Sequence, residues 1–429
     1  MSVSTNNPIE TACKLGYSIA GELGSRAMEK LELSYASRLL PKFSDDPLTR
    51  VRINILFYWK AGYYKSTLLR TFHECHPLKT ANITSMTLAK IFGSIDPKGK
   101  KIILPAFTND IHFVLISELA AMLGGREMKE FADTMNQVLE GERINRQTVS
   151  LGYGSNVENI SDCIEKGVCY DSDKGELSYQ PDVCINAATR PLQGYQFNFL
   201  FRSGYFGRHH ILQRKISDEE ASEHLRRNYI INAVLKQRLK TLNDKLSQVK
   251  IDVIQRPKES LTNSVFEDLN KIVLDEIKGR QNLTLPDVLT PRLKDDVLRE
   301  LVSHAFIRTA WQNNFENIEH LEYTSADIEY VKANLGDFID FSLDPLIAPG
   351  TFVTRRLRKR DVVKTITLKL LSDDKEHHID EIWAFVKVEI HDISQATVYN
   401  SLLELTTEGK VVRTEKGYYR LAGGVNQIG

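Results

Sequence analysis

The sequence lacks an excess of charge of either sign. Its 56 lysine and arginine residues balance 56 aspartate and glutamate residues, so any contact with a polyanion must come from local basic patches. It also lacks cysteines in a C-x-x-C spacing, and its 5 cysteines are an odd number. These two features favour reduced thiols in an intracellular protein (cytoplasm or nucleoid) and argue against a structural zinc site.

Long apolar stretches are missing as well. The first residues, MSVSTNNPIETACKLG, contain no basic segment followed by an apolar one, so we expect no signal peptide. The most apolar run, FVLISELAAML (113–123), is too short to span a membrane and carries Glu118. We therefore expect no membrane association.

The sequence does contain an alternation of apolar strand-like runs and helical segments. Buried strands are predicted at 51–58, 113–117 and 183–188. A hairpin is predicted to begin in 146–154 and to return through 175–189. Helices are predicted at 8–43, 126–140, 217–247, 290–311 and 324–336, the last of them closed by Gly336. Strands alternating with helices predict an α/β fold with a mainly parallel sheet.

The stretch AGYYKST (61–67) lies between the first predicted strand and a helix. A phosphate-binding loop needs a tight turn, a lysine that reaches the terminal phosphates and a hydroxyl that binds magnesium at a helix start. Gly62 can supply the turn, Lys65 the charge and Ser66 the magnesium ligand, with Thr67 as an alternative. These residues predict a nucleotide site.

The loop departs from the usual pattern because Trp59 and Tyr64 stand where glycines are usual. An ordinary strand–loop–helix turn with a surface lysine therefore stays open as an alternative. A second signal is the apolar run that ends in Ser117-Glu118, since P-loop ATPases carry acids at the end of a neighbouring strand. Glu118 would polarise the attacking water, whereas Ser117 stands where an aspartate is usual.

Several pieces in order resemble the AAA+ core of minichromosome maintenance (MCM) proteins and their viral or plasmid relatives. They are AGYYKSTLLRTF, FVLISELAAML, NQVLEGERINRQTVSLGYG and INAATRP. The resemblance implies a P-loop NTPase core with a helical lid, ATP and Mg²⁺ as cofactors, DNA as partner and a homo-oligomeric ring such as a hexamer.

The resemblance also implies three further residue roles. Thr189 would contact water or the γ-phosphate, next to Arg190 where the family has asparagine. The segment FLFRSGYFGRHHIL (199–212) resembles the arginine-finger segment, with Arg208 preferred over Arg202 as the residue acting on a neighbouring subunit's nucleotide. Arg292 matches the arginine of the sensor 2 helix, which faces the phosphates.

Two further elements of the family touch DNA in a central channel. The matching segments are an insertion at 88–107 and a hairpin at roughly 146–182. The basic residues that would make the contacts are Lys98, Lys100 and Lys101, with Lys166 and Lys174 as weaker candidates. A solvated turn is the alternative for each of them.

The last part of the chain follows a linker at 344–350 and a basic run, RRLRKR (355–360). Three helices and then two short strands are typical of a winged helix. Its candidate DNA contacts are Gln395, Thr397, Tyr399 and Asn400 on the recognition helix and Arg413 and Lys416 on the wing. The same module also docks proteins, which stays open as an alternative.

These observations predict five parts. They are a helical segment (1–50), an AAA+ α/β core (51–215), a helical lid (216–345), a basic linker (346–360) and a winged helix (361–429). We expect an ATPase acting on DNA, as an MCM-like helicase or a replication-initiation factor. The alternative is a weakly hydrolysing or non-hydrolysing nucleotide-binding scaffold whose winged helix regulates through DNA.

Overall fold

The computed structural model divides into two compact units, residues 1–347 and residues 348–429. The residues it describes are 7–45, 50–83, 87–96, 98, 100–122, 128–148, 157–192, 194–214, 216, 218–226, 229–278, 291–343, 359–373, 375–389, 393–415 and 417–422. Each unit is considered by itself below.

A five-stranded parallel sheet forms the centre of the first unit, with strand order β10-β1-β9-β5-β2. Its strands are β1 (Ile55–Tyr58), β2 (Thr80–Ile83), β5 (Phe113–Ile116), β9 (Cys184–Thr189) and β10 (His210–Gln213). Every residue of β1, β5 and β9 is buried, as expected for parallel strands covered on both faces. The predicted α/β fold with a mainly parallel sheet is confirmed.

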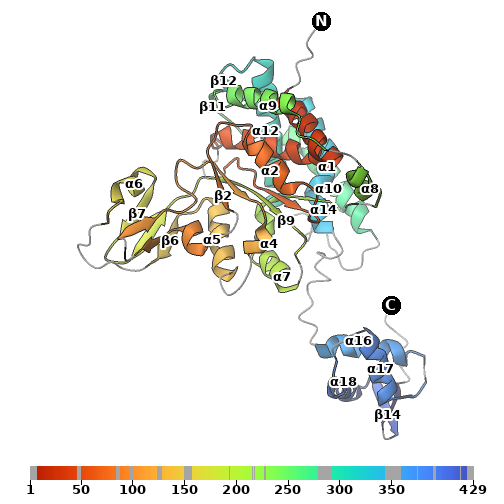
Figure 1. Ribbon diagram of the computed structural model, residues 1–429. Coiled ribbons are helices and arrows are strands. Elements are labelled where there is room, and N and C mark those ends of the chain that lie inside the picture. The colour runs from red at the N-terminus through yellow and green to blue at the C-terminus, as the bar shows by residue number, and fades with distance from the viewer. Residues whose placement is uncertain are drawn as a thin grey trace. The chain divides into compact units, whose positions relative to one another are not determined.

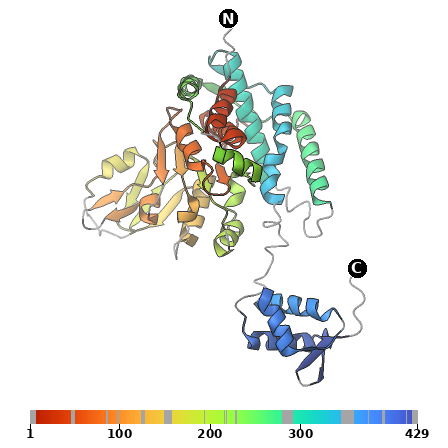
Figure 2. The same ribbon diagram turned by 45° about the vertical axis from the view of Figure 1, so that its right-hand side comes forward.

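Helices cover both faces of this sheet (Figures 1 and 2). On one face α1 (Pro8–Leu39) packs against α2 (Lys65–His73), α9 (Ala233–Leu246) and α12 (Pro291–Gln312). In Figure 1 the other face carries three helices, α4 (Leu119–Met122), α5 (Met128–Glu140) and α7 (Gly194–Arg202). The helix predicted at 8–43 is confirmed, although α1 bends at Ala20 and Gly21, which have non-helical backbone angles.

Two small antiparallel sheets project from one side of the core (Figure 1, orange to yellow). The first is the pair β3 (Ser94–Asp96) and β4 (Lys101–Ile103), which follows the short helix α3 (Leu88–Phe92). The second has the order β6-β8-β7. Its elements are β6 (Ile144–Gln147), α6 (Ile160–Glu165), β7 (Val168–Asp171) and β8 (Glu176–Tyr179). The predicted hairpin is confirmed by the β6–β8 pairing, although 149–156 lies outside the described residues.

The rest of the first unit is mainly helical. Besides α9 and α12 it contains η1 (Phe206–Arg208), α8 (Asp218–Arg226), α10 (Glu259–Ile277), α13 (Ser325–Ala333), α14 (Leu335–Leu343) and the paired strands β11 (Ile251–Val253) and β12 (Ile318–His320). The single helix predicted at 217–247 is wrong, because a new N-cap at Asn232 starts α9 separately from α8. The predicted stop at Gly336 is also wrong, since α13 ends at Ala333 with Asn334 as its C-cap, and Gly336 lies inside α14. Ser217 and Thr290 lie outside the described residues.

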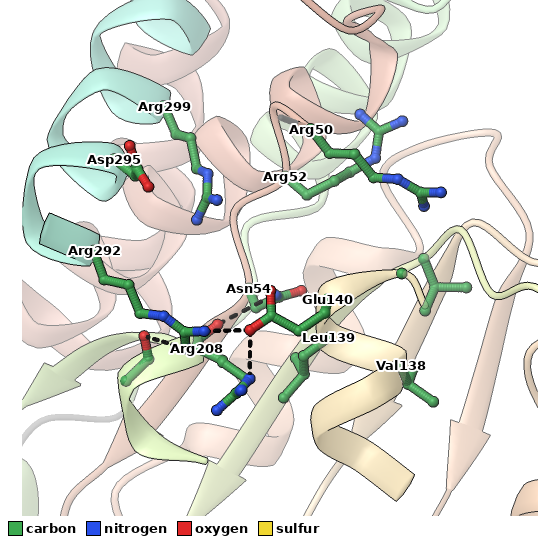
Figure 3. A pocket seen from close by; sticks show the side chains of 13 residues that line it. Arg50, Arg52, Asn54, Val138, Leu139, Glu140, Arg208, Arg292, Asp295 and Arg299 are labelled. Carbon is green, nitrogen blue, oxygen red and sulfur yellow. Dashed lines mark hydrogen bonds and ion pairs between the residues drawn. The ribbon is translucent and has the colours of Figure 1, made fainter. Parts of the chain in front are cut away.

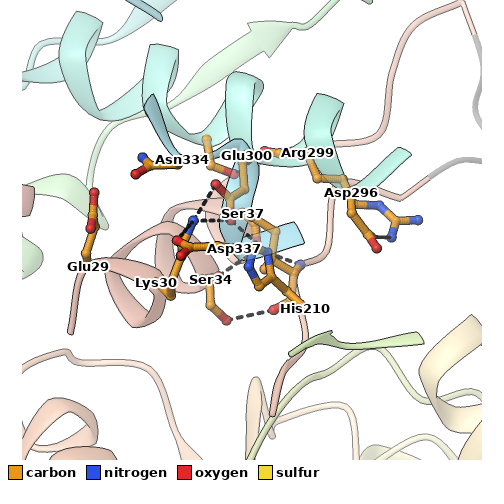
Figure 4. Close-up of polar contacts among 12 residues, drawn as sticks. Glu29, Lys30, Ser34, Ser37, His210, Asp296, Arg299, Glu300, Asn334 and Asp337 are labelled. Atoms are coloured by element: carbon orange, nitrogen blue, oxygen red, sulfur yellow. Dashed lines mark hydrogen bonds and ion pairs between the residues drawn. The ribbon is translucent and has the colours of Figure 1, made fainter. Parts of the chain in front are cut away.

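A buried ionic network joins the N-terminal helix α1 to α12, which is far from it in the sequence (Figure 4). The ammonium of Lys30 donates to both carboxylate oxygens of Glu300 at 2.8 Å, and Nδ1 of His210 lies 2.8 Å from the same carboxylate. Burial alone would raise the pKa of Glu300, but the charge of Lys30 and the contact with His210 outweigh it and hold the pKa at about 2. The network therefore joins α1, α12 and the start of β10.

The described residues of the second unit form three helices and a three-stranded antiparallel sheet of order β13-β15-β14 (Figure 2, blue). Its elements are α16 (Lys359–Leu371), β13 (His377–His378), α17 (Ile379–Glu389), α18 (Gln395–Thr407), β14 (Val411–Glu415) and β15 (Tyr418–Leu421). Ser394 caps α18 by accepting a hydrogen bond from the Thr397 N–H. The predicted order of helices followed by a hairpin is confirmed.

Candidate phosphate-binding site

The loop between β1 and α2 is closed by its own aromatic side chain. Trp59 is buried, and its indole N–H donates to the carbonyl of Tyr63 at 3.1 Å. Gly62 and Tyr64 have φ of 90° and 56°, and the left-handed region at Tyr64 is one that favours glycine. The loop thus makes its turn with a tryptophan and a tyrosine at the two positions where glycines are usual.

Lys65 begins α2 and folds back over this loop. Its ammonium donates to the carbonyls of Trp59 at 2.7 Å and Lys60 at 2.9 Å. Burial lowers the pKa of Lys65 to about 8, although the negative charge of Glu118 acts in the opposite direction. A positive charge is therefore held beside free N–H groups at a helix start, which is an arrangement suited to phosphate.

Ser66 links this loop to the neighbouring acidic strand end. Its hydroxyl donates to the carbonyl of Ser117 at 3.2 Å, and Ser117 follows the last residue of β5. Thr67, the next residue of α2, is partly exposed. The hydroxyl predicted to bind magnesium thus lies against the strand end predicted to supply the acid.

Glu118 is fixed by the end of a third strand, β9. Its Oε1 accepts hydrogen bonds from the Thr189 hydroxyl at 3.3 Å and from the Arg190 N–H at 3.2 Å. Because β9 lies between β1 and β5, the carboxyl ends of all three strands meet at one edge of the sheet. Ligands of open α/β sheets bind at this edge. The structure therefore brings Lys65, Ser66, Glu118 and Thr189 together, as the sequence predicts.

This edge offers few ligands to a metal ion. Among the described residues, no group of three or more His, Cys, Asp or Glu side chains is arranged to hold one. Magnesium usually binds through one or two protein oxygens, water and substrate phosphates. The Ser66 hydroxyl and the Glu118 carboxylate fit that pattern, provided that a phosphate supplies further oxygens.

The two predicted phosphate-contacting arginines lie together at the opposite edge of the sheet. Arg208 lies two residues before β10, whose first strand residue pairs in parallel with the first residue of β1. The Nε of Arg208 lies 2.8 Å from the carboxylate of Glu140, which Arg292 also contacts. The length of β1, about 10 Å, and its loop separate this pair from Lys65.

Arg292 and Lys65 of one chain therefore lie at opposite edges of the sheet, which the sequence did not predict. The start of a helix can be read from the sequence, but the edge of the sheet that it faces depends on strand order. Arg202, the alternative to Arg208, ends α7, and its side chain lies outside those described.

A cavity of about 270 Å³ adjoins Arg208 and Arg292 (Figure 3). We call it the arginine pocket and define it by the five arginines in its lining: Arg50, Arg52, Arg208, Arg292 and Arg299. Sequence reasoning missed Arg50, Arg52 and Glu140. For the two arginines, the sequence signal that could have found them was the R-V-R triplet just before the apolar run of β1.

No protein-family model matches the sequence, and no curated protein matches it. The assignment of a function therefore depends on the geometry of the chain itself. None of the helices in the described part of the chain combines the length and apolar character needed to cross a lipid bilayer.

The lysines predicted to touch DNA from the insertion gather at the β3–β4 turn. Lys98 and Lys100 lie in this turn, where Lys100 has a φ of 45°, and Lys101 begins β4. Lys101 is paired with Glu158 at 3.0 Å. On the second small sheet, Lys166 and Lys174 are paired with Asp162 and Asp171. These pairs offset part of the positive charge that DNA would require.

In the second unit, the predicted contacts on α18 differ in exposure. Gln395 and Tyr399 are exposed, whereas Thr397 and Asn400 are partly buried. Gln395 donates to Asp380 at 2.6 Å, which fixes its amide against α17. Arg413 is exposed on β14, and Lys416 lies outside the described residues.

Proposed function

We propose that the chain is an ATP-binding AAA+ protein that acts on DNA as an oligomer, in the manner of an MCM-like helicase or replication-initiation factor. The observation that carries the proposal is the meeting of Lys65, Ser66 and Glu118 at the carboxyl edge of the sheet. Glu118 follows β5 and Thr189 ends β9, whereas the AGYYKST loop follows β1. Their position beside Lys65 is therefore evidence separate from the sequence of that loop.

Each group in this set has a role in phosphoryl transfer. Lys65 exchanges two backbone carbonyls for phosphate oxygens, and the N–H groups at the start of α2 supply further donors. Ser66 binds magnesium, which neutralises charge on the phosphates. Glu118 accepts a proton from, or orients, the attacking water, and Thr189 holds the carboxylate in place.

The arginines take part from a second copy of the chain. Since Lys65 and Arg208 lie at opposite edges of the sheet, a head-to-tail contact between two copies brings them to one nucleotide. Arg208 and Arg292 then stabilise the negative charge of the transition state, a role worth about 10³–10⁵-fold in kcat for arginine fingers.

The second unit supplies a DNA contact in this proposal. The order of three helices and a hairpin supports a winged helix, with α18 entering the major groove and β14 and β15 forming the wing. Tyr399 is the exposed aromatic residue of α18 that is best placed for base contact.

Nucleotide binding is tested by replacing the loop lysine. We expect Lys65→Ala to weaken ATP binding at least about tenfold, because a charge-assisted hydrogen bond contributes roughly 1.5–3 kcal/mol. Lys60→Ala is the matched control, since Lys60 is an exposed lysine of the same loop. Unchanged ATP affinity in Lys65→Ala, measured by calorimetry, would overturn the proposal.

A second candidate function is a nucleotide-binding scaffold that hydrolyses ATP slowly or not at all and regulates through its DNA-binding unit. The observation that favours it is the Ser66–Ser117 contact, because a backbone carbonyl stands where a carboxylate usually supports magnesium. Phosphate release with and without single-stranded DNA separates the two. Turnover that single-stranded DNA stimulates supports the motor, whereas no turnover, or slow turnover that DNA leaves unchanged, supports the scaffold.

A further inference from the structure

Another cavity lies between the end of α2 and one face of α9. Its volume is about 770 Å³, within the usual range of small-molecule sites. Its lining comes from the chain at 73–77 and from the face of α9 between Ala233 and Asp244. We call this cavity the α2–α9 pocket. It shares no lining residue with the arginine pocket, and Lys65, Ser66 and Glu118 lie outside its lining.

The two histidines of the lining belong to a chain of hydrogen bonds that reaches β9. The Ser34 hydroxyl contacts Oδ1 of Asn186 at 3.2 Å, which orients the amide so that its Nδ2 donates to Nε2 of His73 at 3.3 Å. Burial lowers the pKa of His73 well below its ordinary 6.5, so the ring is neutral at pH 7. Because its Nε2 accepts, its proton lies on Nδ1, which donates to Nε2 of His76 at 2.8 Å.

This chain leaves His76 with an unused N–H group. Since Nε2 of His76 accepts from His73, the proton of the neutral ring lies on Nδ1. His76 is only 6% exposed, and burial lowers its pKa to about 4. The backbone of Leu78 is near enough to act on the ring, but no acceptor among the described residues has hydrogen-bond geometry with Nδ1. Buried N–H groups almost always have a partner, so this one indicates a ligand in the pocket that His76 lines.

The charged residues of the lining balance each other but are not all paired. Lys236 and Glu74 pair with each other. Lys240 and Asp244 lie one turn apart on α9, and neither forms an ion pair within the described part of the chain. The described lining therefore offers one cation, one carboxylate and one N–H group to a ligand, and its two lysines and two acids suit a ligand without net charge.

We propose that the α2–α9 pocket binds a small zwitterion of the amino-acid class with an apolar side chain. The ligand carboxylate accepts from Nδ1 of His76 and from the ammonium of Lys240, and the ligand ammonium donates to Asp244. The ligand side chain packs against Pro77 and Ala233, the smaller apolar members of the lining. This site is independent of the proposed function, because it uses none of the groups assigned to the nucleotide.

The pocket is tested by calorimetry on the full-length wild-type chain without nucleotide. Alanine, valine, leucine, methionine and phenylalanine are titrated separately, and we expect at least one to bind saturably with a Kd below about 1 mM. Lys240→Gln and Asp244→Asn should each raise this Kd about tenfold or more, the effect of losing one charge-assisted hydrogen bond. Lys245→Gln, an exposed lysine of α9 outside the lining, is the matched control and should leave the Kd unchanged.

The zwitterionic nature of the ligand is tested with analogues that lack one charge. For leucine these are isocaproate, which lacks the ammonium, and isoamylamine, which lacks the carboxylate. Each should bind about tenfold more weakly than leucine, because one charge-assisted contact is lost. An analogue that binds as tightly as the complete amino acid would overturn the zwitterion.

The buried N–H group is tested by His76→Phe, which keeps a ring against Tyr35 but removes the donor. We expect about tenfold weaker binding, with thermal melting as the check on folding. The variants of Lys240 and Asp244 keep the test valid if His76→Phe does not fold. Lack of saturable binding by every amino acid, or an unchanged Kd in either α9 variant, would overturn the site. None of these results bears on ATP binding at Lys65, so the two proposals can fail separately.

Discussion

At the scale of single residues, the loop of Lys65 uses aromatic side chains where glycines are usual. The Trp59 indole closes the loop through the Tyr63 carbonyl, and Tyr64 adopts the left-handed backbone conformation. Lys65 is left bound to two carbonyls of its own loop, with its pKa lowered by burial to about 8. Its charge is therefore lost within a pH range that experiments reach easily.

The affinity for ATP should fall as pH rises through about 8. Below this pKa Lys65 is charged in the free protein, and above it phosphate binding must also take up a proton. The loss should reach about tenfold per pH unit until the higher pKa of the bound state is passed. Calorimetry from pH 6.5 to 10 measures it. Lys65→Ala should bind weakly with no such dependence, and a flat profile for the wild-type chain would refute the assignment.

The sequence places Lys65 in the loop after one apolar strand and Glu118 just after another. Their strands end at the same edge of the sheet, because strand ends of one direction meet in a parallel sheet. Glu140 and Arg50 were missed because the arginine pocket is assembled from segments far apart in the chain. No local pattern reveals strand order, so the sequence also did not predict that Arg292 and Lys65 lie at opposite edges of the sheet.

At the scale of elements, buried strands were predicted more securely than helix boundaries. Runs such as ILFY and FVLI are apolar throughout, and burial on both faces requires that pattern. Helix ends depend on single caps: Asn232 starts α9 and Asn334 closes α13. The helix α10 was missed altogether. The element order of the second unit was visible because Ser394 and Gly409 mark both ends of α18.

The helix α18 should carry part of the DNA affinity. Tyr399→Ala removes an exposed aromatic side chain whose truncation leaves the buried Val398 and Leu402 in place. We expect roughly a fivefold to hundredfold loss of duplex affinity, the range for a base contact worth about 1–3 kcal/mol. Fluorescence anisotropy at fixed salt measures it, with the exposed Leu403→Ala as the matched control. Equal binding by the wild-type chain and Tyr399→Ala would favour the protein-docking alternative.

At the scale of the whole first unit, the buried pair of Lys30 and Glu300 joins segments 270 residues apart. Both side chains are fully or almost fully buried. Removal of one partner leaves an uncompensated charge in the interior. Glu300 also contacts His210, two residues after Arg208, so the same network supports the edge of the sheet that carries the arginine pocket.

Lys30→Met should destabilise the chain by about 3–5 kcal/mol, the usual cost of breaking a buried ion pair. Because the pKa of Glu300 in the folded state is about 2, below the ordinary 4.5, its stabilising contribution is present above pH 4.5 and is lost as pH falls towards 2. Urea unfolding at pH 7 and pH 3 measures both effects. A cost under about 1 kcal/mol at pH 7 would show that the pair contributes little.

The whole molecule also explains why one chain alone would not complete the proposed ATPase site. Lys65 lies at the carboxyl edge of the parallel sheet, and Arg208 lies at the amino edge. A head-to-tail assembly joins the two edges of neighbouring copies. The loop and the arginine can therefore be inactivated on separate chains and recombined.

The most direct measurement is ATP turnover by an equal mixture of Lys65→Ala and Arg208→Ala chains. Each variant alone should be inactive, since every interface lacks one group. In the mixture about a quarter of interfaces pair an intact loop with an intact arginine, so we expect about a quarter of wild-type turnover. A mixture as inactive as its components, although it assembles like the active wild-type chain, would contradict a nucleotide site shared between copies.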